Sequence, residues 1–287
     1  GLIVLGAMIW GNSALNTLRK TVKSGLNDRF ASAFGMRYSA EVHNPVRFDA
    51  FREHGPLPPA YAAVLLDRIF LLDDRHQDFA VQIEQHVVVT QAMQHGRGVL
   101  VLVSHFGSFE VMRVIGCQER QLPIRIVLDR RQGAMSTALL EALNPGLAAG
   151  VIDAAQRGPA LALALKQALD QGHLLGMMAD RVRSGQRTLS VQFMNRPAQL
   201  PEHPWILASV LQVPVILAFG IYQGGNRYRI RFEHLAERVV LPRASRGAAA
   251  QAYAQAYADR LELQVRAAPY NWFNFYDFWA DETAADH

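Results

Sequence analysis

A chain of 287 residues that is half hydrophobic and 19% charged is globular, with length enough for one large or two modest domains, so global disorder is excluded. Cys117 is the single cysteine, so the chain cannot form an intrachain disulfide, and the spaced Cys/His partners of a structural zinc site are absent from the sequence. This cysteine usage fits a reducing compartment. The net charge of +4 is mildly basic, and charge alone suits anionic lipid, an acidic carrier protein or nucleic acid equally well.

The chain starts with an apolar run at residues 1–10. This run is about half as long as the roughly 20 residues that a transmembrane helix needs. It is compatible with the end of a membrane anchor, a processed segment or a buried helix. A basic stretch follows and would suit phosphate headgroups or simply a solvated helix face; it comprises Arg19, Lys20, Lys23 and Arg29.

A proline-rich break at residues 55–59 separates this region from the rest of the chain. We therefore predict an N-terminal accessory region, with a possible membrane-associating role, at residues 1–60. The main globular domain is expected at residues 61–287.

Apolar runs of strand length alternate with helical patterns through the first half of this domain. Near-continuous apolar strands separated by helices are typical of an α/β sheet that is largely parallel and buried on both faces. The predicted strands lie at residues 98–103, 124–128, 150–152 and 173–178, and helices are expected from Phe109, from Ala134 and over residues 159–169.

The pattern changes after Asp180. A glycine-rich turn at residues 224–226 joins two adjacent apolar runs and predicts an antiparallel hairpin, so the sheet is expected to be mixed. Further predicted elements are a strand at 188–193, a helix at 204–211, hairpin strands at 213–222 and 228–232, and a helix at 246–266 with Tyr253, Tyr257, Leu261 and Val265 on its buried face.

The segment from Val103 to Glu110 combines groups suited to acid–base chemistry. His105 follows an apolar strand, at the edge of an α/β sheet where ligands bind. A histidine can take a proton from an alcohol, and Glu110, in the first turn of the next helix, could turn back to orient the imidazole. Gly107 would let a substrate approach closely, and Ser108 is a natural N-cap for a helix whose amides could hold an oxyanion.

On these residues alone, a hydrogen-bonded histidine and a glutamate that favours the helix dipole explain the segment equally well. Several competing motifs are absent from the sequence: the Gly-x-Ser-x-Gly elbow, the Gly-x-Gly-x-x-Gly loop, the Walker loop and His-Glu-x-x-His. Their absence favours the catalytic interpretation only modestly.

The segment His105 to Glu110 resembles the His-x4-Asp/Glu motif of the glycerolipid acyltransferase superfamily. Its setting is similar to the branch that contains the lipid A biosynthesis acyltransferases. The resemblance covers about residues 61–279, with further matches at residues 180–181, 191–198 and 207–215. The aromatic segment 272–279 resembles a narrower subgroup from aryl polyene and xanthomonadin pigment pathways.

The resemblance implies that His105 is a base on an acceptor hydroxyl, which attacks an acyl thioester without an acyl-enzyme, and that Glu110 orients the base. Asp180 matches an acidic residue at a strand end, although Arg181 follows it in place of the family's usual glutamine. Either Arg130 or Arg131 matches a family arginine that could meet phosphate or the thioester-bearing arm.

The resemblance also implies the partners. The donor would be an acyl carrier protein or CoA thioester, which is a co-substrate, and no cofactor or metal is expected. The acceptor would be a glycolipid or glycerolipid on the cytoplasmic face of a bacterial inner membrane.

Two surfaces bear on these partners. Five arginines between residues 113 and 131 give a local excess of positive charge that suits phosphate or a solvated face. The aromatic tail at 269–279 suits core packing that lines an acyl tunnel, or an interfacial anchor. The tail has no interleaved basic residues, which argues against nucleic acid. The alternatives are an acyl-thioester hydrolase, in which water replaces the alcohol, and a non-catalytic lipid-binding protein.

Overall fold

The computed structural model describes residues 59–279, apart from residues 74, 95, 119, 131–133, 157–158, 184 and 275–277. The predicted accessory region up to residue 58, with its apolar run and basic stretch, lies outside the described residues. Its membrane role and the domain boundary at residue 60 stay predictions. In the described part of the chain, no helix has the length and apolar character needed to cross a bilayer.

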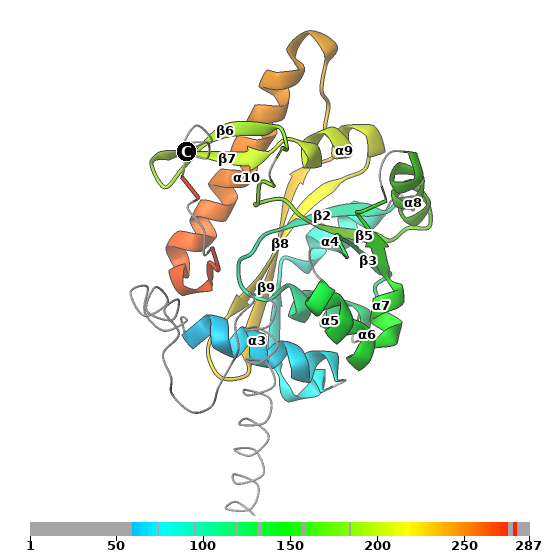
Figure 1. The fold of residues 1–287 in the computed structure, drawn as a ribbon, viewed down its shortest axis with the longest axis vertical. Helices are drawn as coiled ribbons and strands as arrows, with labels where there is room; N and C mark the ends of the chain where they lie inside the picture. Colours follow the sequence, from blue (N-terminus) through cyan, green and yellow to red (C-terminus); the bar gives the residue numbers. More distant parts are fainter. Residues whose placement is uncertain are drawn as a thin grey trace, which may run out of the picture. The chain divides into compact units, whose positions relative to one another are not determined.

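The described residues form a seven-stranded sheet, a two-stranded hairpin and helices (Figure 1). The strands are β1 (Ala80–Glu84), β2 (Val99–Val103), β3 (Ile124–Leu128), β4 (Val151–Asp153), β5 (Leu174–Met178), β6 (Thr188–Phe193), β7 (Arg196–Pro201), β8 (Val215–Tyr222) and β9 (Arg227–Ala236). The α-helices are α3 (Pro59–Leu72), α4 (His86–Met93), α5 (Phe109–Gln118), α6 (Ala134–Leu143), α7 (Pro145–Ala149), α8 (Pro159–Asp170), α9 (His203–Leu211) and α10 (Arg246–Ala267). Short 3₁₀ turns are η1 (His76–Asp78), η2 (Arg243–Ser245) and η3 (Pro269–Asn271).

The main sheet is mixed and largely parallel, as predicted. Its strand order is β1-β9-β8-β2-β5-β3-β4. Every neighbouring pair is parallel except β8 and β9, which form the predicted antiparallel hairpin. The turn between them uses Gly224 and Gly225 at positive φ, a backbone conformation that glycine adopts without steric cost.

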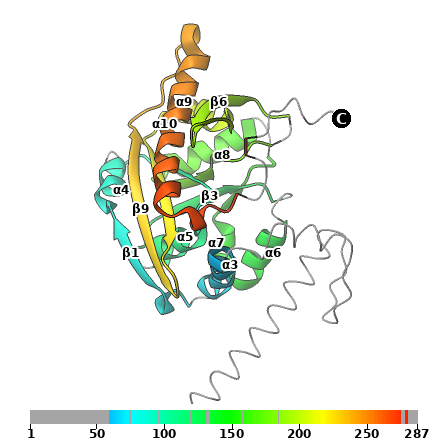
Figure 2. The ribbon, with the colours of Figure 1, turned by 90° about the vertical axis from the view of Figure 1, so that its left-hand side faces the viewer.

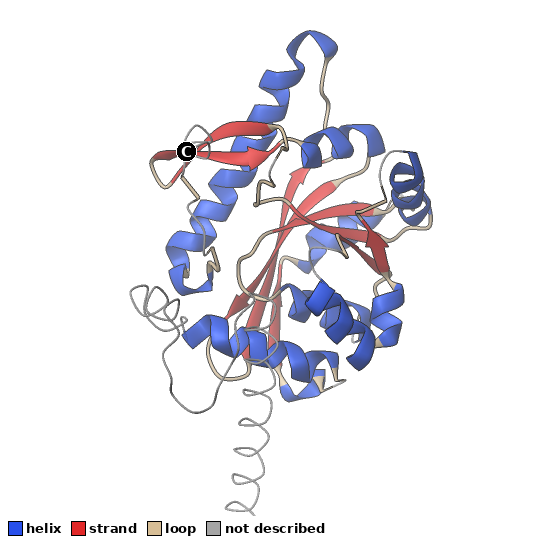
Figure 3. Cartoon of the chain, viewed as in Figure 1, coloured by secondary structure: helices blue, strands red, loops and turns tan. Residues whose placement is uncertain are grey.

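Both faces of the sheet are buried under helices, which Figure 3 shows as blue ribbons on either side of the red strands. Alternate residues of each strand point to opposite faces. In β2, Leu100 and Leu102 pack with α8, α9 and α10, whereas Val99, Val101 and Val103 pack with α3, α4 and α5. Two apolar cores therefore hold the strand that leads to His105.

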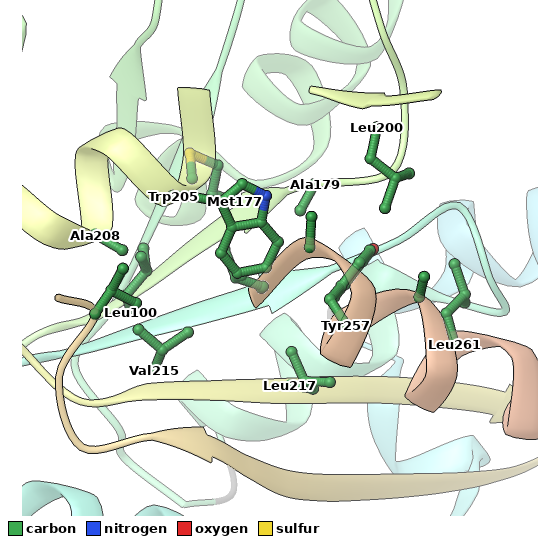
Figure 4. Packing of buried hydrophobic residues seen from close by; sticks show 14 of the residues in the cluster. Leu100, Met177, Ala179, Leu200, Trp205, Ala208, Val215, Leu217, Tyr257 and Leu261 are labelled. Atoms are coloured by element: carbon green, nitrogen blue, oxygen red, sulfur yellow. The ribbon is translucent and has the colours of Figure 1, made fainter. Parts of the chain in front are cut away.

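The helix α10 packs against the core that contains Leu100 and Leu102, through the residues predicted to lie on its buried face. Tyr257, Leu261 and Val265 are fully buried, while Tyr253 is half-buried. Figure 4 shows Tyr257 and Leu261 in one buried cluster with Leu217 of β8 and the indole of Trp205 from α9. The hairpin β6–β7 lies beside α10 in both Figures 1 and 2, and Gln255 of α10 bonds the backbone of Gln192 in β6.

Two strands were not predicted. The strand β7 contains two prolines, and Met194 and Asn195 in the turn before it have positive φ without a glycine signal. Proline is tolerated there because β7 has only one partner strand. The strand β1 is a half-buried edge strand with mixed composition, parallel to β9.

Candidate active site

The sheet register brings His105 and Asp180 together. Strands β2 and β5 are parallel neighbours, and Val103 pairs with Met178 at their carboxyl ends. His105 and Asp180 each stand two residues beyond that pair. The two chains continue side by side, because the amide of Ala179 donates to the carbonyl of Val103 at 3.0 Å.

The Asp180 carboxylate bonds both the backbone and the ring of His105. The His105 amide donates to Oδ2 at 2.7 Å, and the ring Nδ1 lies 2.9 Å from Oδ1 and 3.1 Å from Oδ2. The Asp180 side chain is 4% exposed, whereas that of His105 is 29% exposed. A buried carboxylate on Nδ1 favours the tautomer with its proton on Nδ1 and stabilises the imidazolium. Nε2, which bonds no described residue, is then free to accept a proton.

The loop after His105 is clamped against β8. Gly107 has φ +65°, and a Cβ there would lie 1.9 Å from the carbonyl oxygen of Gly220, so only glycine fits. The amides of Gly107 and Ser108 donate to Asn271 and Gly220, respectively. These two amides are thus committed within the protein, and the rigid loop fixes the position of His105.

Ser108 is the predicted N-cap of α5. The amide of Val111, three residues further on, donates to its hydroxyl at 3.2 Å, as a capping side chain requires. Ser108 is 2% exposed. Its hydroxyl stabilises the helix that carries Glu110.

Glu110 contacts two arginines rather than the imidazole. Oε2 accepts a hydrogen bond from Nη2 of Arg113, one turn along α5, and Oε1 lies 3.0 Å from Nη2 of Arg68 on α3. Arg113 is 3% exposed and Glu110 8%. Since buried charges are costly unless paired, Glu110 keeps two guanidinium groups in place, and the position on Nδ1 that we predicted for Glu110 is filled by Asp180.

The segment after α10 completes the site. The amide of Phe273 donates to the carbonyl of His105 at 2.9 Å, and Nη2 of Arg181 donates to the carbonyl of Phe273 at 2.8 Å. The ring of Tyr61 on α3 packs edge-on against Phe273. Burial raises the pKa of Tyr61, and the positive charges of Arg181 and Arg68 oppose that shift.

Tyr61 and Arg68 were not predicted as site residues. They stand seven residues apart, two turns along one face of α3. The sequence could have shown that this tyrosine and this arginine share one helix face. It does not show that this helix lies over the carboxyl end of β2, where His105 is located.

Three described arginines from the stretch between residues 113 and 131 have different partners. Arg113 is buried against Glu110, and Arg125 near the start of β3 donates to the carbonyl of Ala149. Arg130, beyond the carboxyl end of β3, pairs with Glu141 of α6 at 2.9 Å. The structure shows no contact between Arg130 and His105, and Arg131 lies outside the described residues.

The aromatic tail packs as part of the core where it is described. Phe273 and Phe278 are each 5% exposed. The ring of Phe193 on β6 is surrounded by those of Trp272, Phe278 and Trp279, with centroids 5.2, 5.2 and 6.4 Å away. The prediction of core packing is thus confirmed for Phe273 and Phe278, and the predicted acyl tunnel stays a prediction.

Comparison with protein families identifies a match over most of the chain. The family model described as bacterial lipid A biosynthesis acyltransferase matches residues 60–280. A search of curated proteins finds no similar protein. The matched range contains every helix and strand described above, apart from Pro59, the first residue of α3.

Proposed function

We propose an acyl-transfer reaction for this chain, which belongs to the bacterial lipid A biosynthesis acyltransferase family. In this proposal the chain moves an acyl group from a thioester to a lipid hydroxyl, and His105 is the general base. One observation carries the assignment: Nδ1 of His105 is held by the buried Asp180 carboxylate, while the ring remains partly exposed. We assign the role of orienting partner to Asp180.

The chemistry follows from that arrangement. Nε2 of His105 removes the proton from the acceptor hydroxyl as its oxygen attacks the thioester carbonyl. The imidazolium formed is stabilised by Asp180, 2.9 Å from Nδ1. When the tetrahedral intermediate collapses, the carbon–sulfur bond breaks, and the proton on Nε2 passes to the departing thiolate. An ester and a free thiol result, with no acyl-enzyme.

Glu110 acts through the arginines that it holds. Its two oxygens bind Arg68 and Arg113, and the charges of Arg68 and Arg181 both act on the phenol of Tyr61. Guanidinium groups suit phosphate because they donate parallel hydrogen bonds. We therefore assign Arg68 and Arg181 to a phosphate of the donor arm or of the acceptor lipid. Arg181 bonds the carbonyl of Phe273, whose amide bonds His105, whereas Arg130 pairs with Glu141 of α6.

The family supports acyl transfer to a lipid, and the aromatic segment at its end bears on the chain transferred. Trp272 and Trp279 are only partly buried around Phe193, and such rings accommodate either a fatty or a flat aryl-polyenyl chain. We place the enzyme at the cytoplasmic face of the bacterial inner membrane, where a lipid acceptor and an acyl carrier protein or CoA donor meet.

Lipid mass spectrometry tests the proposal. Lipids from cells that make the wild-type chain are compared with lipids from cells that make the His105→Ala variant at the same level. We expect a lipid species heavier by one acyl group only with the wild type, and its mass identifies chain and acceptor together. Identical lipid profiles would overturn the proposal.

A second assay separates the transferase from a hydrolase. The purified protein receives either acyl carrier protein or CoA thioester, with and without a lipid extract from the same cells. Thiol release that rises when lipid is added supports transfer and identifies the donor. Thiol release that is indifferent to lipid would contradict transfer and favour hydrolysis.

A further inference from the structure

A cavity opens at the amino edge of the sheet, opposite the carboxyl edge that bears His105. It has a volume of about 390 Å³, within the usual range of small-molecule sites. Its walls include the residues just before β5 and β4, and the start of β3. Five-residue strands place this edge about 16 Å from the carboxyl edge that bears His105.

The lining combines positive and apolar groups. Arg113 and Cys117 come from α5, Arg125 from β3, and His173 precedes β5. The apolar part is contributed by Leu122, Pro123, Ile124, Ile126 and Leu147. None of the described residues that line the cavity is acidic.

Arg113 is the unusual member of this lining. Its side chain is 2% exposed, and only Nη2 is bonded, to Glu110. Nε and Nη1 are buried and have no hydrogen-bond partner among the described residues. A buried guanidinium needs partners for its donors, because an unsatisfied buried donor is costly.

We propose that this cavity binds a small organic anion, whose acidic group is held by Arg113 and Arg125 and whose apolar part lies against Leu122, Ile124 and Leu147. The acidic group would accept from the free donors of Arg113. Arg125, whose Nη1 donates to the carbonyl of Ala149, adds a second positive charge. The site is separate from the chemistry proposed for His105, and its test needs no acyl transfer.

Cys117 provides a local reporter of binding. It is the only cysteine in the chain and lines the cavity. Burial raises the pKa of its thiol, and the nearby Arg113 guanidinium opposes the shift. A mildly alkaline solution, about pH 8.5, therefore gives a measurable rate of reaction with iodoacetamide.

The experiment measures the rate of Cys117 alkylation in the full chain at constant ionic strength. The probes are hexanoate and its neutral counterpart 1-hexanol. We expect saturable protection by hexanoate, with a slower rate by about fivefold or more, and little protection by 1-hexanol. Equal protection by the two probes, or none by hexanoate, would overturn the proposal.

Two variants assign the effect to the arginines. Arg125→Gln should weaken the apparent affinity for hexanoate by about tenfold, as expected for loss of a charge-assisted contact. Arg120→Gln removes the same charge from an exposed neighbour outside the lining and should leave the affinity unchanged. Unchanged affinity in Arg125→Gln, or an equal loss in both variants, would contradict the proposed site. Arg113→Lys keeps a positive charge beside Glu110. In a variant whose melting curve shows a folded protein, the apparent affinity for hexanoate should also fall.

Discussion

Replacement of Asp180 by asparagine separates orientation of His105 from folding. The side chain keeps its shape, and its oxygen can still accept the His105 amide that now donates at 2.7 Å. Its amide group would then face Nδ1, which must accept a hydrogen bond instead of donating one. The proton moves to Nε2, and the ring loses the lone pair that the base needs.

The expected loss in turnover is large. The carboxylate is 4% exposed and 2.9 Å from Nδ1, so its charge-assisted bond is little screened by solvent. Loss of both the tautomer and the stabilisation of the imidazolium lowers kcat by about 10²–10⁴-fold, equivalent to about 3–5 kcal/mol in the barrier. The melting temperature should change little.

The assay is thiol release from an acyl thioester with lipid acceptor at saturation. Asp129→Asn is the matched control, because this carboxylate also follows a strand of the same sheet edge but pairs with Arg183 at 3.0 Å. We expect the control to stay within about threefold of the wild type, because the Arg183 side chain is 44% exposed and solvent screens the pair. A folded Asp180→Asn variant within tenfold of wild-type kcat would refute the role of Asp180.

Three further variants address the frame of the site. Gly107→Ala should destabilise the fold by about 2–4 kcal/mol, from positive-φ strain and the backbone clash, whereas Gly172→Ala, at φ +79° with open space around it, should cost about 1 kcal/mol in thermal unfolding. Glu110→Gln should lower the free energy of unfolding by about 3 kcal/mol, because it leaves buried positive charge unpaired. The double variant Glu110→Gln/Arg113→Met should lose less stability than the sum of the two single variants, and additive losses would contradict the pairing. Burial raises the pKa of Asp67 above its ordinary value of 3.8, so the folded state holds this proton more tightly than the unfolded state. The wild type should therefore gain melting temperature relative to Asp67→Asn as the pH falls from neutral toward 3.8. A gain in the opposite direction would rule out the raised pKa.

The elements with a strong periodic signal were predictable. The residues 124–128 and 188–193 form strands with the predicted bounds, and α5 begins at Phe109 as its serine cap indicated. Burial on two faces leaves a continuous apolar run, which the sequence displays directly. The strand β7 was missed because its prolines argue against a strand unless its pairing is known.

The partner of His105 was not predictable from local spacing. Glu110 is near in sequence, and its position in the first turn of α5 made it the natural partner. Asp180 is 75 residues away, and its proximity depends on β5 lying next to β2. Predicted strands do not carry their order in the sheet, so the register that aligns the two residues emerges only in the fold. The same applies to Arg68, whose role depends on α3 packing against α5.

The most direct measurement is acyl transfer by purified His105→Ala. With an acyl thioester donor and lipid acceptor, we expect at least a 10²-fold loss of ester formation, because no other described group takes the position of Nε2. The variant should melt within a few degrees of the wild type, since the ring is partly exposed. A folded His105→Ala protein that forms the lipid ester at the wild-type rate would contradict the assignment of His105 as the base.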